Sequence, residues 1–167
     1  MRRFIPLIAL TCLLMGTASF AGSDEFKLYL VRHAEKQADG SRDPALTKEG
    51  KQRAEQLATW LTDKDIENIW SSDYQRTRDT AQPLATQLGV EPRIYDPGNQ
   101  PVLVGHLLAR KDNALVVGHS NTIPELARML CECEIADMDE SEYDRLIVIS
   151  VDGAQINVET LNQTELN

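Results

Sequence analysis

Short apolar runs alternate with segments of helical periodicity along most of this chain, and this alternation restricts the fold more than any other feature. Strand-like runs cover residues 26–31, 65–71, 91–95 and 114–117, and helical patterns cover residues 47–61, 73–88, 101–110 and 121–130. Two further strands, 143–151 and 154–161, are joined at Asp152-Gly153, a dipeptide that favours a tight hairpin turn. We therefore expect an α/β fold, a three-layer α/β/α sandwich with a mostly parallel central sheet and an antiparallel edge hairpin.

The first residues differ in character from the rest of the chain. Arg2 and Arg3 precede an apolar run over residues 4–15, which is too short to span a bilayer as a helix, and small residues follow up to Ala21. This order is typical of a secretory signal peptide, with an uncleaved membrane anchor as the alternative. We expect residues 1–21 to be removed and residues 22–167 to form a single domain. The mature protein would then be periplasmic or secreted, without stable membrane insertion.

The chain is strongly acidic. Its formal net charge is −9 at pH 7, and the expected signal peptide carries two arginines and no acid, so the mature charge is about −11. Such a charge repels nucleic acid at long range, and no nucleic-acid partner is expected. An anionic substrate would have to be held by a local cluster of arginines.

Two cysteines, Cys131 and Cys133, lie beyond the expected signal peptide. Their separation by one residue is unfavourable for an unstrained disulfide, so we expect packing residues at a helix end, with a redox pair as the alternative. A Cys-x-Cys pair with only His106 as a further ligand is a weak metal signal, and no metal or other cofactor is expected. His106 lies on an apolar helix face, where we expect it to pack in the core.

Two of the three histidines directly follow expected strands. Arg32-His33 comes after residues 26–31, and Gly118-His119 comes after residues 114–117. Open α/β sheets bind their ligands at the carboxyl ends of strands. The planar fork of an arginine binds phosphate oxygens, and a neutral imidazole nitrogen can attack phosphorus. The pattern predicts a phosphate site with His33 as the nucleophile, Arg32 as a phosphate ligand and His119 as a donor to a phosphate oxygen.

A third group of residues, 70–81, begins at a strand end and opens a helix. The free N–H groups of a helix N-terminus attract anions. Arg76 lies near the first turn and can point into the same pocket, whereas Arg78, two positions on, cannot share its face. We expect Arg76 to bind phosphate and Arg78 to be solvated or ion-paired.

These groups together resemble a known family. Arg32-His33-Ala34-Glu35, Ser72-x-x-x-Arg76-x-x-x-Thr80-Ala81 and Gly118-His119-Ser120 are similar to the three signatures of the histidine phosphatase superfamily, as is Asp43-x-x-Leu46-Thr47-x-x-Gly50. That superfamily includes cofactor-dependent phosphoglycerate mutases and many phosphatases. The resemblance implies that His33 is phosphorylated, that Arg32, Arg76 and His119 complete the phosphate pocket, and that the chemistry needs no metal.

The leaving oxygen of an alkyl phosphate also needs a proton donor. Many members of the family place a Glu or Asp between the second and third signatures, where this chain has Glu91 and Asp96. We prefer Asp96, which follows the expected third strand, although a turn-forming role before Pro97-Gly98 fits it equally well. Small members that resemble phosphohistidine phosphatases lack a clear acid, since a phosphoramidate leaving group needs less help. Glu35 is expected to orient its neighbours.

The expected function is that of an exported, metal-independent phosphatase that hydrolyses phosphomonoesters through a phosphohistidine on His33. Its partner would be a phosphorylated small molecule or a phosphorylated envelope component. Alternatives are a phosphohistidine-protein phosphatase, a phosphoglycerate-mutase-type phosphotransferase, and a non-catalytic domain that binds phosphate or anionic glycans. The short chain leaves little room for capping insertions, which predicts an open pocket. Lys36, close to His33 in the sequence, is expected at the rim of the pocket.

Overall fold

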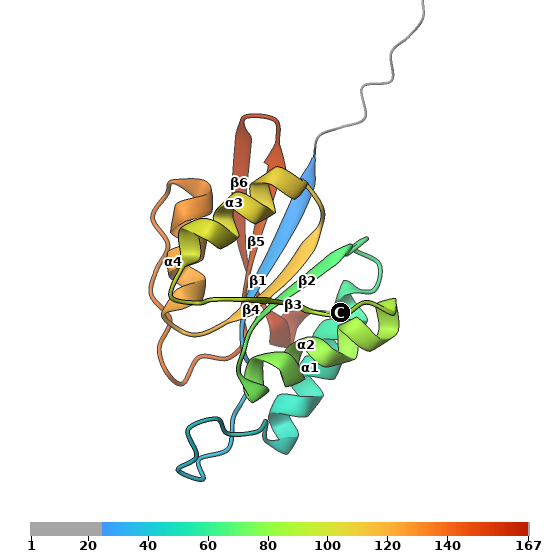
Figure 1. The fold of residues 1–167 in the computed structure, drawn as a ribbon, viewed down its shortest axis with the longest axis vertical. Coiled ribbons are helices and arrows are strands. Elements are labelled where there is room, and N and C mark those ends of the chain that lie inside the picture. The colour runs from blue at the N-terminus through green and yellow to red at the C-terminus, as the bar shows by residue number, and fades with distance from the viewer. Residues whose placement is uncertain (1–24, 167) are drawn as a thin grey trace, which may run out of the picture.

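The computed structural model describes residues 25–166, so the expected signal peptide over residues 1–21 lies outside the described residues. Its strands are β1 (Phe26–Arg32), β2 (Asn68–Ser72), β3 (Arg93–Tyr95), β4 (Ala114–Gly118), β5 (Arg145–Asp152) and β6 (Gln155–Asn162). They form one sheet in the order β3-β2-β4-β1-β5-β6 (Figure 1). The first four strands run parallel, whereas β5 pairs antiparallel with β1, and β6 antiparallel with β5.

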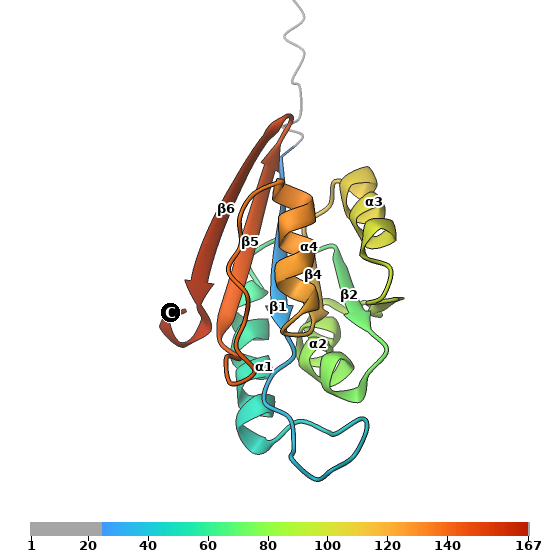
Figure 2. The same ribbon diagram turned by 90° about the vertical axis from the view of Figure 1, so that its left-hand side faces the viewer.

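The helices are α1 (Lys48–Leu61), α2 (Gln75–Leu88), α3 (Gln100–Arg110) and α4 (Thr122–Cys131), with a short 3₁₀ helix at Gln163–Glu165. α1 and α2 share one hydrophobic core with the sheet, and α3 and α4 share another on its opposite face (Figure 2). This arrangement confirms the expected three-layer α/β/α sandwich with an antiparallel edge hairpin.

Strand β1 shows why its sequence is apolar at nearly every position. Leu28 and Leu30 pack into the core beneath α3 and α4, while Tyr29 and Val31 pack into the core beneath α1 and α2. All four side chains are almost fully buried. A parallel strand covered on both faces needs no polar face, which is why its sequence does not alternate.

The local signals that end the elements act mostly as their chemistry predicts. Thr47 caps α1 by accepting a hydrogen bond from the Gly50 N–H at 3.1 Å, and Gly89 ends α2 with a φ of 66°. α2 continues through Pro83 as one helix. The final hairpin turns one residue later than expected, at residues 153–154, because Asp152 still pairs with Gln155.

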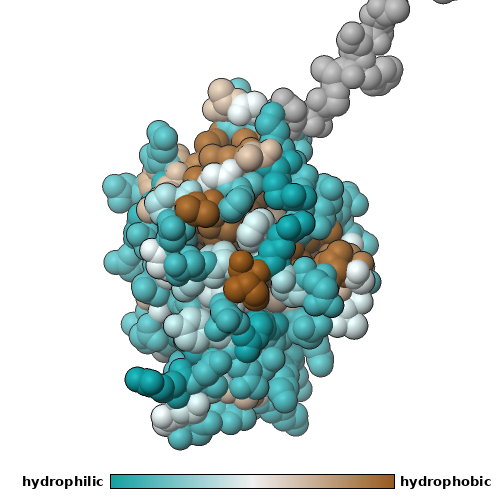
Figure 3. Space-filling model, in the orientation of Figure 1, coloured by the Kyte–Doolittle hydropathy of each residue, from teal (hydrophilic) through white to brown (hydrophobic). Residues whose placement is uncertain are grey.

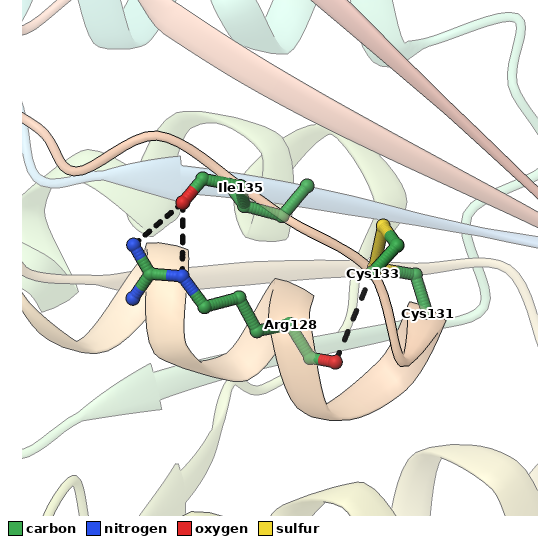
Figure 4. The surroundings of a disulfide bond; sticks show 4 residues. All are labelled: Arg128, Cys131, Cys133 and Ile135. Atoms are coloured by element: carbon green, nitrogen blue, oxygen red, sulfur yellow. Dashed lines mark hydrogen bonds between the residues drawn. A yellow bond between two sulfur atoms is a disulfide. The ribbon is translucent and has the colours of Figure 1, made fainter.

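Cys131 and Cys133 form a disulfide at the end of α4 (Figure 4), so the expectation of two separate packing residues was wrong. Glu132 between them adopts a left-handed conformation with a φ of 52°. This turn brings the two Cα atoms to 5.1 Å, within the usual range for disulfides. Spacing in the sequence could not show this, because the distance depends on the backbone conformation of the intervening residue.

His106 is exposed, so the expectation of a core position was also wrong. α3 buries only the face that carries Leu103 and Leu107, and His106 lies beside that face. Its ring stacks on the indole of Trp70, with the ring centroids 5.7 Å apart and the planes inclined by 22°.

The surface in the orientation of Figure 3 is largely hydrophilic, with apolar side chains in separate groups. Ile94 and Val102 are the most exposed of the large apolar residues in the described part of the chain, at 50% and 52%. None of the helices within residues 25–166 has the length and apolar character needed to cross a bilayer.

Candidate active site

The candidate site lies where the neighbouring strands β1 and β4 end. The chain leaves β1 toward α1 on one face of the sheet and leaves β4 toward α4 on the other. Such a divergence opens a crevice at the carboxyl ends of the strands. The His33 N–H donates to the Gly118 carbonyl at 2.9 Å, and the rings of His33 and His119 lie 5.5 Å apart. The fold therefore brings together the two histidines that the sequence places at strand ends.

The orientation of His33 suits a nucleophile. Its Nδ1 lies 2.8 Å from the Ala34 carbonyl oxygen, which can only accept a hydrogen bond. Nδ1 must therefore carry the proton, and we assign the lone pair to Nε2 on this basis. His33 is 2% exposed. The hydrogen bond from Nδ1 to the Ala34 carbonyl oxygen holds the imidazole ring against the backbone of its own loop.

Both histidines are neutral near pH 7. Burial, and after it the charges of Arg32, His119 and Arg76, lower the pKa of His33 to about 3 against the opposing hydrogen bond to Ala34. Burial, followed by the same two arginines, lowers the pKa of His119 to about 4. A neutral His33 keeps the Nε2 lone pair that an attack on phosphorus requires.

Arg32 serves both the fold and the pocket. Its side chain is 1% exposed, and Nη1 donates to the carbonyl oxygens of Asp139, Glu140 and Glu142 at 3.1, 2.9 and 2.9 Å. The guanidinium also lies 4.2 Å from the centre of the Tyr143 ring. Nη2 is the nitrogen that pairs with the Glu140 carboxylate, at 3.0 Å. One edge of the guanidinium therefore holds the segment between α4 and β5, and the other, at Nη2, contacts a carboxylate at the pocket.

Arg76 projects from the first turn of α2, as the sequence predicts. Its guanidinium lies 4.4 Å from the centre of the Tyr74 ring, and Nη1 lies 3.4 Å from Oδ1 of Asp43. Asp43 also accepts hydrogen bonds from the Gln75 N–H at 2.8 and 3.0 Å, so it caps α2 from the loop before α1. Arg78 pairs with Asp73 at the exposed surface instead, which confirms the expectation of a solvated or ion-paired residue.

His119 is oriented by the second signature. Its Nε2 lies 2.9 Å from the hydroxyl of Ser72, which in turn donates to the Thr77 hydroxyl at 3.1 Å. The Thr77 hydroxyl donates to backbone carbonyls, so the Ser72 oxygen accepts from Nε2–H of His119. Gly118 is required before it, since a Cβ there would lie 2.7 Å from the Tyr95 hydroxyl. The ring is thereby fixed with Nδ1 as its remaining nitrogen.

These side chains line one open pocket of about 440 Å³. Its charged and titratable lining residues include Arg32, His33, Lys36, Arg76, His119 and Glu140. The pocket is open, as the short chain predicts. Lys36 is one of the residues that line it, as expected. Glu140 was not predicted, because it lies in irregular backbone 108 positions after Arg32 and no local motif marks it.

Neither carboxylate considered as a proton donor lines this pocket. Asp96 is exposed, and its Oδ1 accepts from the Gly98 N–H at 2.8 Å, which is the turn-forming role weighed against catalysis. Glu91 precedes β3 and therefore lies toward the end of that strand that is remote from the pocket. Asp96 as the donor is thus disfavoured by its position.

Glu35 holds the first signature in place from outside the pocket. Its carboxylate accepts from Arg53 on α1, with the closest contact at 2.6 Å. Gly50, at the start of α1, packs so closely that a Cβ would lie 2.3 Å from the Glu35 carbonyl oxygen. The loop after β1 is therefore fixed to α1, as an orienting role for Glu35 predicts. Among the described residues, no group of three His, Cys, Asp or Glu side chains could hold a metal ion.

Acid should destabilise this protein through the two histidines of the pocket, of which His33 is buried and His119 half-buried. Their native pKa values of about 3 and about 4 lie below the value of about 6.5 expected in the unfolded chain. Below pH 6.5 the unfolded state therefore binds protons that the native state does not. The free energy of unfolding should fall with decreasing pH by up to about 1.4 kcal/mol per pH unit for each histidine.

Urea unfolding at pH values from about 7.5 to 4.5 measures this dependence. His33→Gln should make the free energy of unfolding depend less steeply on pH, because glutamine does not titrate. A free energy of unfolding that stays constant between pH 6.5 and 4.5 in the wild type would contradict the burial of neutral histidines.

Comparison with known proteins relates this site to a family. Residues 28–98, which include Arg32, His33 and Arg76, match the family described as "Histidine phosphatase superfamily (branch 1)". "Probable phosphoglycerate mutase GpmB" of Escherichia fergusonii is 36% identical over 101 residues, which are 57% of this chain and 46% of that protein. The chain therefore spans less than half the length of this curated relative.

Solved structures extend the likeness over most of the described residues. The protein histidine phosphatase SixA in complex with tungstate has a TM-score of 0.68 at 18% identity, and the alignment covers 85% of this chain and 100% of SixA. The alpha-ribazole phosphatase of Shigella flexneri has a TM-score of 0.68 at 16% identity, with 82% and 96% covered. At these identities the likeness is one of fold. Residues 28–98, with the two signatures inside them, therefore match the histidine phosphatase superfamily in sequence.

Proposed function

We propose that this protein is a metal-independent phosphatase that hydrolyses phosphomonoesters through a phosphohistidine on His33. The observation that carries the proposal is a neutral, fixed His33 beside two arginines in an open pocket. Arg32 and Arg76 supply the positive charge that offsets a phosphoryl group, and His119 provides a further donor. Arginine forks suit this task because they present several donors in one plane.

The reaction has two steps. Nε2 of His33 attacks phosphorus, the N–P bond forms as the P–O bond to the leaving group breaks, and the leaving oxygen takes a proton. Water then attacks the phosphohistidine, the N–P bond breaks, and phosphate leaves with His33 neutral again. A bound phosphate offsets the arginine charges that lower the pKa of His119, which favours its protonated form as a donor to the transition state.

We also propose that the protein is exported and acts on a phosphorylated small molecule or a phosphorylated envelope component. The signal-like residues 1–21 favour export. The disulfide between Cys131 and Cys133 also favours it, because such bonds persist in oxidising compartments. Cell fractionation, with N-terminal sequencing of the mature chain, tests this part of the proposal.

A phosphohistidine-protein phosphatase is the second candidate. The observation in its favour is that neither Asp96 nor Glu91 lines the pocket, since a phosphoramidate needs less help from an acid than an alkyl ester does. The fold likeness to SixA over the whole of that protein is consistent with this candidate. Relative rates on a phosphohistidine peptide and on phosphomonoesters distinguish the two functions.

The main test is hydrolysis of p-nitrophenyl phosphate by the purified protein in the presence of EDTA. We expect steady turnover, and a phosphoryl group on His33 by mass spectrometry after alkaline quenching. A protein that neither hydrolyses the ester nor becomes phosphorylated on His33 would rule out the proposal.

A further inference from the structure

The proposed hydrolysis needs a group that protonates the leaving oxygen, and one carboxylic acid is placed to do so. Among the residues that line the pocket, Glu140 is the one acidic side chain. It lies in the segment between α4 and β5, 20 positions after Ser120. This place in the chain is far from Glu91 and Asp96, where the sequence suggested a donor.

Two hydrogen bonds place the Glu140 carboxylate at the pocket. Oε2 lies 3.0 Å from Nη2 of Arg32, and Oε1 accepts from the hydroxyl of Ser120, the residue after His119. The carboxylate therefore connects the ends of both signature strands. Its side chain is 80% exposed, whereas that of Arg32 is 1% exposed. Glu140 thus lies at the mouth of the pocket, with the phosphate-binding groups beneath it.

The direction of attack brings the leaving group to the same side. Phosphoryl transfer places the attacking and leaving atoms roughly in line through phosphorus. His33 is buried at the floor, so the leaving oxygen has to point toward the open mouth. We propose that Glu140 is a catalytic residue that protonates the leaving oxygen and then takes a proton from the attacking water. This inference rests on the proposed phosphatase function.

The charges around Glu140 permit this cycle. In the empty pocket its pKa is lowered, first by the Ser120 hydrogen bond and then by Arg32 and Lys36, so it is a carboxylate. A phosphoryl group that binds Nη2 of Arg32 breaks the ion pair between Arg32 and Glu140 and brings a negative charge close to Glu140. Both changes raise the pKa of Glu140. The carboxylate then takes up a proton from solvent or from a monoanionic ester.

The protons balance over the two steps. As the N–P bond to His33 forms and the P–O bond breaks, the proton passes from Glu140 to the leaving oxygen, which departs as an alcohol. As water attacks, its proton passes to the Glu140 carboxylate, the N–P bond breaks, and phosphate is released. Glu140 is then protonated, ready for the next ester or for exchange with solvent.

Glu140→Gln tests the inference, because it keeps the size and removes the acid. The substrates are p-nitrophenyl phosphate, with a good leaving group, and glycerol 2-phosphate, whose alkoxide is a poor one. We expect the single-turnover rate of phosphohistidine formation from glycerol 2-phosphate to fall by about 10²–10⁴-fold and the same rate from the nitrophenyl ester to fall much less. Phosphohistidine should still form from the nitrophenyl ester. Glu134→Gln, the same change at an exposed site on the same segment, should leave both rates unchanged.

The outcomes separate this inference from the proposed function. An equal fall in the rate of phosphohistidine formation from both substrates would show that Glu140 acts by positioning Arg32 or Ser120, and would overturn the inference. Unchanged or higher rates, with tighter inhibition by inorganic phosphate, would show that Glu140 merely competes for Arg32, and would also overturn it. In both cases an active wild type leaves the proposed function standing. A wild type without turnover and without phosphohistidine would refute the proposed function, and this inference with it.

Discussion

Replacing His33 with alanine should reduce phosphatase turnover by about 10⁴-fold or more, because the group that forms the covalent intermediate is lost. Arg32, Arg76 and His119, the proposed phosphate-binding groups that line the pocket, remain in this variant. Inorganic phosphate should therefore still bind within a few-fold of its wild-type affinity. Steady-state kinetics on p-nitrophenyl phosphate and calorimetric titration with phosphate measure the two quantities.

Two further variants make this result interpretable. His33→Gln keeps a side-chain N–H that can donate to the Ala34 carbonyl, so its loss of turnover cannot be assigned to a disturbed loop. His106→Ala removes an exposed histidine that stacks on Trp70, and it should retain full activity. Substantial turnover in both His33 variants would contradict His33 as the nucleophile. Phosphate binding without turnover in the wild type would instead indicate a non-catalytic binding domain.

Replacing Arg32 with alanine should weaken both stability and catalysis. The carbonyl oxygens of residues 140 and 142 lose the Arg32 donor, that of Asp139 keeps only the Glu142 N–H, and the Tyr143 ring loses the guanidinium packed against it. We expect the free energy of unfolding to fall by about 2–4 kcal/mol, because partly buried acceptors are left unpaired. We also expect kcat/KM to fall by about 10²–10³-fold, because a charged donor to the transition state is removed.

Arg32→Lys and Arg78→Ala separate these two effects. Lysine keeps the charge, but its ammonium group cannot hold the carbonyl oxygens on one edge and bind phosphate on the other. Arg32→Lys should therefore remain well below the wild type in kcat/KM. Arg78→Ala changes an exposed arginine paired with Asp73. It should leave the free energy of unfolding nearly unchanged and kcat/KM within about twofold of the wild-type value. A fully active Arg32→Ala would contradict the place of Arg32 in the phosphate pocket.

Much of this site could be predicted because its residues follow strand ends. The apolar run over β1 and the run over β4 mark buried parallel strands, and their carboxyl ends share one edge of the sheet. Arg32, His33 and His119 are therefore placed near one another by topology alone. Arg76 was predicted in the same way, because it opens the helix after β2.

The remaining site residues escaped prediction because their roles depend on distant contacts. Asp96 follows a strand as expected, yet its carboxylate is used by the Gly98 N–H in a turn, and neighbouring residues line the pocket in its place. Asp43 matched a family pattern, but only the structure shows that it caps α2 and contacts Arg76. The residues that neighbour a side chain in the sequence do not determine which of several possible partners it contacts in the folded protein.

The sequence by itself determined the layers, the order of helices and strands, and the two histidines at one edge of the sheet, because these follow from short-range periodicity and chain topology. Only the tertiary structure decided that residues 139–142 fold back onto Arg32 from more than 100 positions away, with Glu140 at the pocket mouth. It also decided that Cys131 and Cys133 are bonded. The physical reason is that both depend on irregular backbone, whose course is set by the contacts it finds and not by a repeating pattern.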